Sequence, residues 1–236
     1  MKLYPVYFNI ENRDILVIGG GKVALRKVNK LLEAGARVKI VASRIDPGFF
    51  ALTENKNVTI KLRKFEEQDL DSKLFVFAAT DDELLNSEIS ELAKSRNIFC
   101  NIADSADKSD FIIPSCIQRG DLVLSVSTSG KSPALSRKLR KDLQKEFGDE
   151  YSVFLYFLGK LRQIVVSRSK GDPENKNIFR DIVFGELLKF IKEKNIQGIE
   201  DEISKIVKDH QTSEKLLDDL LEKNHNYFFD VEKIED

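Results

Sequence analysis

The segment at residues 15–24 constrains the fold more than any other part of the sequence. A short, largely apolar run, Asp14–Ile18, leads into three glycines, Gly19–Gly21, and then into residues 22–34, whose apolar side chains have near-helical spacing. A strand that is buried on both faces of a parallel sheet has such an apolar run. A strand that passes directly into a helix begins a βαβ unit, so we expect an α/β fold with a parallel sheet.

The first half of the chain continues this alternation. Further strands are expected at residues 38–42, 58–62, 74–79 and 98–100, with a second helix over 82–96. Gly35 is expected to end the first helix, as a residue just beyond a helix C-terminus does.

The pattern changes after residue 110. Strand-like runs at 111–114, 115–118 and 121–126 predict a small second sheet, with a tight antiparallel turn at Arg119-Gly120. Helices are then expected from Pro133, with Ser132 as N-cap, and over about 150–167, 176–194, 199–209 and 212–223.

Composition excludes several classes of protein. The chain has 38 Lys and Arg against 39 Asp and Glu, a formal net charge of -1, whereas a general nucleic-acid binder has a basic excess. Its 2 Cys and 2 His are too scattered for an ordinary four-ligand zinc site, so no metal site is expected. No stretch approaches the roughly 20 apolar residues of a membrane helix, and the first residues do not resemble a signal peptide. We expect a cytoplasmic protein with no nucleic-acid or membrane partner.

The glycine segment predicts a dinucleotide site. Gly19-Gly20-Gly21-Lys22-Val23-Ala24 matches G-x-G-x-x-A in the strand-to-helix context that this pattern requires. The first glycine permits the tight turn, the second lets a pyrophosphate approach the backbone, and the alanine allows close helix packing. The N–H groups at the helix start favour phosphates. A Rossmann-like site with Gly19, Gly21, Lys22, Val23 and Ala24 at the cofactor follows.

The end of the second strand bears on the choice of cofactor. NAD sites usually have Asp or Glu there to bind the ribose hydroxyls, but this chain has Ser43 and Arg44. The serine can bind a ribose hydroxyl and the arginine can meet a 2′-phosphate. On these residues alone, NADP is slightly favoured over NAD.

The series of motifs as a whole resembles precorrin-2 dehydrogenase, the amino-terminal module of siroheme synthase. The order and spacing of the pieces carry the resemblance, which covers about residues 1–147. They are Tyr4–Phe8, Gly19–Lys27, Ala34–Ala36, Ala78–Asp82, Asn101 with Asp104, Asp110–Ser115 and Ser127–Pro133.

This resemblance implies a three-part organisation and an activity. An NAD-binding Rossmann domain is expected at residues 1–113, a dimerisation and substrate-binding segment with short strands at 114–147, and a helical domain at 148–236. The implied activity is NAD-dependent oxidation of precorrin-2 to sirohydrochlorin, in a homodimer, and some relatives also insert Fe²⁺. NAD is therefore expected, against the weak preference of the residues for NADP.

The resemblance also implies residue roles. Asp104 matches the aspartate regarded as catalytic, and Lys22-Val23 and Ser43-Arg44 match NAD contacts. Thr80 and Asn101 follow strands, where cofactors bind, and are expected there too. The substrate carries acetate and propionate arms, which suit hydroxyls, cations and a helix N-terminus. The residues expected to bind it are Thr128, Ser129, Lys131, Ser132 and Arg137.

A second hypothesis comes from a different class of protein. A non-catalytic dinucleotide-binding sensor would use the same glycine segment, and its helical tail would report the nucleotide state to a partner. Asp104 discriminates between the two hypotheses, because only the enzyme needs a base at that position.

Overall fold

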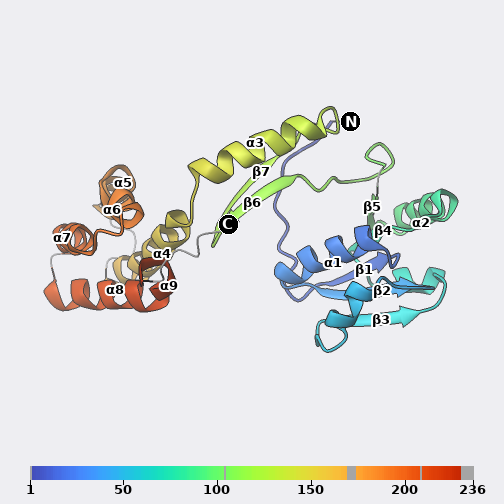
Figure 1. Ribbon diagram of the computed structural model, residues 1–236, viewed down its shortest axis with the longest axis horizontal. Coiled ribbons are helices and arrows are strands. Elements are labelled where there is room, and N and C mark those ends of the chain that lie inside the picture. The colour runs from blue at the N-terminus through green and yellow to red at the C-terminus, as the bar shows by residue number, and fades with distance from the viewer. Residues whose placement is uncertain (1, 104, 169–173, 208, 230–236) are drawn as a thin grey trace. The chain divides into compact units, whose positions relative to one another are not determined.

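The computed structural model describes residues 2–103, 105–168, 174–207 and 209–229 (Figure 1). Contacts divide the chain into two compact units, Met1–Ile113 with Ser129–Lys131, and Pro114–Thr128 with Ser132–Asp236. Each unit has its own hydrophobic core, and each is described separately.

A parallel five-stranded sheet of order β3-β2-β1-β4-β5 forms the first unit (Figure 1). Because β1 is central, the segments that follow β1, β2 and β4 emerge side by side at the carboxyl edge. The elements, in chain order, are β1 (Asp14–Ile18), α1 (Lys22–Glu33), β2 (Arg37–Ala42), η1 (Pro47–Leu52), β3 (Val58–Leu62), η2 (Glu67–Leu70), β4 (Phe75–Ala78), α2 (Glu83–Ser95) and β5 (Phe99–Ile102).

The alternation of side chains along β1 explains why its sequence is apolar throughout. Ile15 and Val17 face one core layer, which includes Ala24 and Val28 of α1. Leu16 and Ile18 face the other layer, with residues of α2. All four strand residues are at most 2% exposed. Gly35 ends α1 with a φ of +78°, and its N–H donates to the Leu32 carbonyl at 2.9 Å, as expected for a C-terminal glycine.

The second unit combines a hairpin with helices. β6 (Ser115–Arg119) and β7 (Leu122–Val126) pair antiparallel, and Gly120 in their turn has a φ of +56°. Ser132 caps α3 (Pro133–Glu146), its Oγ accepting from the Leu135 N–H at 3.2 Å. The remaining helices are α4 (Glu150–Arg168), α5 (Glu174–Phe184), α6 (Leu187–Lys192), α7 (Ile196–Ile206), α8 (His210–Lys223) and α9 (His225–Phe229).

The fold class is confirmed, with three local corrections. Residues 111–114 form no strand, because Phe111 packs edge-on against Phe75 and Phe77 of β4. The single helix expected over 176–194 is two, separated at Gly185, a residue that disfavours helix interiors. The helix expected at 199–209 spans 196–206, because the side chain of Asn195 caps it by accepting from the Gly198 N–H at 3.0 Å.

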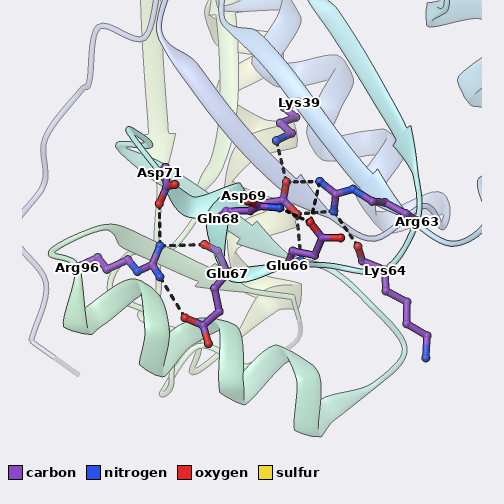
Figure 2. Close-up of polar contacts among 9 residues, drawn as sticks. All are labelled: Lys39, Arg63, Lys64, Glu66, Glu67, Gln68, Asp69, Asp71 and Arg96. Atoms are coloured by element: carbon purple, nitrogen blue, oxygen red, sulfur yellow. Dashed lines mark hydrogen bonds and ion pairs between the residues drawn. The ribbon is translucent and has the colours of Figure 1, made fainter.

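A buried carboxylate ties the irregular segment after β3 to the sheet (Figure 2). The side chain of Asp69 is fully buried and accepts from Lys39 Nζ and from both Nη atoms of Arg63, each at 2.7 Å, and from the Glu66 N–H at 3.1 Å. Burial by itself would raise the pKa of Asp69, but the hydrogen bonds from Arg63 and Lys39 outweigh it and hold the pKa well below its ordinary value. The carboxylate therefore stabilises the fold in its ionised form.

We predict that Asp69→Asn lowers the free energy of unfolding by about 2–3 kcal/mol at pH 7, because it removes charged hydrogen bonds from a buried site. Because the pKa of Asp69 is lowered in the folded protein, its contribution to stability is fully present at pH values above the ordinary carboxyl pKa of 3.8. The contribution is lost as the pH falls below that value. Urea unfolding at pH 7, 5 and 3 measures both effects. The difference between wild type and variant should be equal at pH 7 and 5 and smaller at pH 3.

Asp71→Asn is the matched control. Asp71 pairs with Arg96 at 2.9 Å, but its side chain is 67% exposed (Figure 2), so its loss should cost less than about 1 kcal/mol. Equal costs for the two variants would contradict the structural role given to Asp69.

Candidate functional site

The glycine turn after β1 leaves room for side chains at only one of its three positions. Gly19 has a φ of +123°, and a Cβ there would overlap the Ala79 carbonyl oxygen. A Cβ on Gly20 would overlap the Arg44 carbonyl oxygen. At Gly21, in contrast, a Cβ would meet nothing within 4 Å. The first two glycines thus serve packing, whereas the third keeps a space open beside the backbone.

The start of α1 is suited to an anion. Its N-cap is Gly21, which supplies no side-chain cap, and no acidic residue occupies the first turn. The N–H groups of Lys22, Val23 and Ala24 have no acceptor within the helix, since the first N–H groups of any helix lack one. Lys22 is exposed, while Ala24 is fully buried and lets the helix pack closely on the sheet. The start of α1 therefore combines open space at Gly21 with N–H groups that favour an anion, which is the setting that the glycine motif predicts for a pyrophosphate.

The loop after β2 is attached to the glycine turn. The Asp46 N–H donates to the Gly20 carbonyl at 2.7 Å. Ser43 and Arg44 lie just before this contact and are both exposed. Arg44 Nη2 donates to Oδ2 of Asp81, in the loop after β4, at 3.0 Å. Sequence reasoning did not single out Asp81.

The Thr80 hydroxyl takes part in a local network at the start of α2. Its Oγ1 lies 2.7 Å from Asn86 Oδ1, and Asn86 Nδ2 donates to the Thr80 carbonyl at 3.1 Å. Asp82 caps the helix by accepting from the N–H groups of Leu84 and Leu85. Thr80 is thus held at the carboxyl edge by Asn86, a buried residue that sequence reasoning missed.

The side chain of Asn101 links three parts of the first unit. Its Oδ1 accepts from Lys27 Nζ of α1 at 2.9 Å, and its Nδ2 donates to the Phe111 carbonyl at 2.9 Å. The same Lys27 ammonium lies 5.3 Å from the ring centroid of Phe77. Asn101 is 6% exposed, so its amide shapes the end of β5 rather than projecting into solvent.

The chain leaves β5 in a loop that is fastened at both ends. The Asp110 carboxylate accepts from the Cys100 N–H at 2.9 Å. Ser109 Oγ accepts from the Ile102 N–H at 2.9 Å and donates to the Ser105 carbonyl at 2.7 Å. Asp104, the expected catalytic residue, belongs to this loop by sequence but lies outside the described residues. Burial raises the pKa of the adjacent Cys100 thiol to about 11, so this thiol is not a reactive nucleophile at neutral pH.

The residues expected at the substrate include two that the structure brings together. Thr128 Oγ1 accepts from the Ser132 N–H at 3.1 Å and lies 3.1 Å from Ser136 Oγ. In the turn between Thr128 and Ser132, Ser129 and Gly130 have positive φ angles of +52° and +80°. Lys131 and Arg137 are exposed, and neither forms an ion pair among the described residues. Lys138, by contrast, is paired within α3 with Asp142 at 2.8 Å.

Other features of the described residues do not mark a competing site. A hollow of about 780 Å³ lies along α4 and α8, with lining side chains of both charges, and it contains none of the predicted site residues. Within the described ranges, no group of three or more His, Cys, Asp or Glu is arranged to hold a metal ion. No described helix is long and apolar enough to cross a membrane.

Comparisons with known proteins agree with this geometry. A family model described as NAD(P)-binding matches residues 6–115, and one described as sirohaem biosynthesis protein central matches residues 119–146. The siroheme synthase of Mannheimia succiniciproducens is 32% identical over 212 residues, which are 89% of this chain and 44% of that protein. The siroheme synthase of Citrobacter koseri is 36% identical over 184 residues, or 78% and 40%. The chain thus spans less than half the length of these relatives.

A solved structure described as SirC, precorrin-2 dehydrogenase, is also similar. Its TM-score is 0.68 at 26% sequence identity, and the match covers 84% of this chain and 100% of that chain.

We predict that Gly21→Ala weakens NAD⁺ binding at least tenfold while the free energy of unfolding changes by about 1 kcal/mol or less. The added methyl group would occupy the open space beside the backbone without meeting the protein, and an N-cap tolerates the change at modest cost. Isothermal titration and urea unfolding measure the two quantities.

Gly20→Ala is the contrasting variant. Its Cβ would overlap the Arg44 carbonyl, so it should lose stability first and binding as a consequence. Unchanged NAD⁺ affinity in a well-folded Gly21→Ala protein would contradict the assignment of the turn as a phosphate site.

Proposed function

Because the chain belongs to the siroheme synthase family, in the part that resembles precorrin-2 dehydrogenase, we propose that it oxidises precorrin-2 to sirohydrochlorin with NAD⁺ in siroheme biosynthesis. The observation that carries the proposal is the open space at Gly21, beside the uncapped start of α1, in a chain that matches a precorrin-2 dehydrogenase over all of that protein's length. A phosphate-bearing cofactor fits this space, and the similarity to a precorrin-2 dehydrogenase indicates the reaction in which that cofactor would take part.

The first unit would hold the cofactor through its backbone. Gly19 and Gly21 shape the turn, and the N–H groups of residues 22–24 receive the pyrophosphate. Ser43 and Arg44 lie where the ribose of a bound dinucleotide is expected. Thr80 and Asn101 border the same edge, and their side chains keep the loops after β4 and β5 in place. NAD⁺, when bound, supplies the acceptor for the hydride that the substrate loses.

Asp104 would act as the general base. Oxidation of the macrocycle removes a hydride and a proton, and an ionised carboxylate within hydrogen-bond reach can take the proton. An aspartate is ionised at neutral pH unless its surroundings raise its pKa. Ser109 and Asp110 join the end of the loop that carries Asp104 to β5, through the N–H groups of Ile102 and Cys100. They are therefore positioning residues in this proposal.

The segment around residue 130 would bind the carboxylate arms of the substrate. Lys131 and Arg137 are exposed cations, and Thr128, Ser129 and Ser132 supply hydroxyls near the start of α3. Thr128 and Ser132 also hydrogen-bond each other, so they fix the turn on which Ser129 and Lys131 lie. Cations and a helix N-terminus attract carboxylates more strongly than neutral groups do.

Asp104→Ala should abolish precorrin-2 oxidation while NAD⁺ affinity stays within about twofold of wild type, because a general base typically contributes 10²–10⁴-fold to rate and no cofactor contact is removed. The assay follows NADH absorbance under anaerobic conditions, and titration calorimetry gives the affinity. Asp107→Ala, an exposed aspartate of the same loop, is the matched control and should retain turnover.

The same experiment separates the enzyme from the sensor. Full turnover by Asp104→Ala would remove Asp104 from the mechanism. A wild-type protein that binds NAD⁺ but never oxidises precorrin-2 would favour the dinucleotide-binding sensor with a helical partner-binding tail.

We further propose a cytoplasmic homodimer in which Fe²⁺ insertion is a second activity. The exposed Leu135 and Leu139 on α3 supply an apolar surface that a second copy of the chain would cover. The carboxylate of Asp104 would also assist metal insertion by removing pyrrole protons. Addition of Fe²⁺ or Co²⁺ after anaerobic oxidation should give the absorption spectrum of the metallated product, and an unchanged sirohydrochlorin spectrum would restrict the protein to dehydrogenation.

A further inference from the structure

The position that distinguishes NAD sites from NADP sites carries an arginine, and this arginine forms an ion pair with an aspartate. In Rossmann-type sites, an acid after the second strand binds the ribose 2′-hydroxyl, and an arginine nearby accommodates a 2′-phosphate. Here Arg44 follows β2, and its Nη2 lies 3.0 Å from Oδ2 of Asp81. The acid that NAD sites carry after the second strand is thus brought to the same place from the loop after β4.

The fold determines that these two side chains meet. β1 lies between β2 and β4 in the sheet, so the loops bearing Arg44 and Asp81 flank the glycine turn on its two sides. Gly20 packs against the Arg44 carbonyl and Gly19 against the Ala79 carbonyl, two residues before Asp81. Both loops are therefore held against the turn, and the ion pair bridges them at its exposed rim, where the side chains are 89% and 85% exposed.

We propose that Asp81 is a specificity-determining residue that makes this site prefer NAD⁺ over NADP⁺. The inference rests on the proposed function and deepens it. A 2′-phosphate would have to take Arg44 away from Asp81 and then stand beside the freed carboxylate, with like charges repelling. A ribose hydroxyl is neutral and can use the remaining N–H donors of the guanidinium while the ion pair stays intact.

The physical setting limits the size of the effect. Exposed ion pairs are weak and are screened by salt. The phosphate brings about two negative charges, however, so Asp81 opposes it both by repulsion and by occupying its partner. We expect Asp81 to contribute about five- to tenfold to discrimination at low ionic strength.

The test is direct binding of NAD⁺ and NADP⁺ to the full chain, by titration calorimetry at low and at high salt. Asp81→Asn should tighten NADP⁺ binding about five- to tenfold at low salt and leave NAD⁺ binding within about twofold, and the gain should shrink at high salt. Glu83→Gln removes the same charge from an exposed neighbouring position and should change neither affinity. Circular dichroism checks that each variant is folded.

A double variant isolates the arginine. Arg44→Gln combined with Asp81→Asn should lose the gain in NADP⁺ affinity, because the freed guanidinium is what binds the phosphate. An unchanged NAD⁺-to-NADP⁺ ratio in Asp81→Asn would overturn the inference, and so would an equal gain in Glu83→Gln or a gain that persists in the double variant.

Binding by the wild-type protein separates this inference from the proposed function. If wild type binds NAD⁺ but fails to oxidise precorrin-2, the proposed reaction is wrong while the specificity data still decide the role of Asp81. If wild type binds neither dinucleotide, both are overturned.

Discussion

The turn after β1 is the constraint on which the rest of the candidate site depends. Side chains are impossible at Gly19 and Gly20, because neighbouring carbonyl groups occupy the space that a Cβ would need. This close approach brings the loops after β2 and β4 against the turn and aims the start of α1 at the carboxyl edge of the sheet. The Arg44–Asp81 pair and the open space beside Gly21, where we propose that the phosphates of NAD⁺ bind, both depend on a backbone packing that only glycine permits.

A second constraint is that buried polar groups need hydrogen-bond partners. Among the described residues, no buried side-chain nitrogen or oxygen lacks a hydrogen-bond partner. Asp69 joins the segment after β3 to the sheet by accepting from Arg63 of that segment and from Lys39 of β2. Asn101, Ser109 and Asp110 fasten the chain where it leaves β5. In each case a segment outside the sheet is held by a few side-chain hydrogen bonds, since it cannot use the hydrogen bonds of the sheet. The loop that carries Asp104 is therefore fastened at its base.

The pattern of the sequence was sufficient for most of the architecture. The strands of the parallel sheet, both of its helices and the hairpin β6–β7 were predicted close to their observed positions. The buried face of each of these elements is visible in the sequence as an apolar run or as apolar residues at helical spacing. The glycine motif likewise marked the tight turn after β1, because only glycine meets the steric demand at Gly19 and Gly20. The predicted strand at 111–114 was wrong because Phe111 is apolar for packing on β4, and apolar residues in a loop resemble those in a strand.

What the sequence could not specify is which side chains meet. Arg44 and Asp81 are 37 residues apart and Lys27 and Asn101 are 74 apart, so no local pattern joins them. Arg44 by itself favoured NADP, and only its pairing with Asp81 gives a physical reason for NAD. That pairing depends on the strand order, which places β1 between β2 and β4. Local periodicity reports which faces are buried, whereas the neighbours of an exposed charge are decided by how the strands assemble.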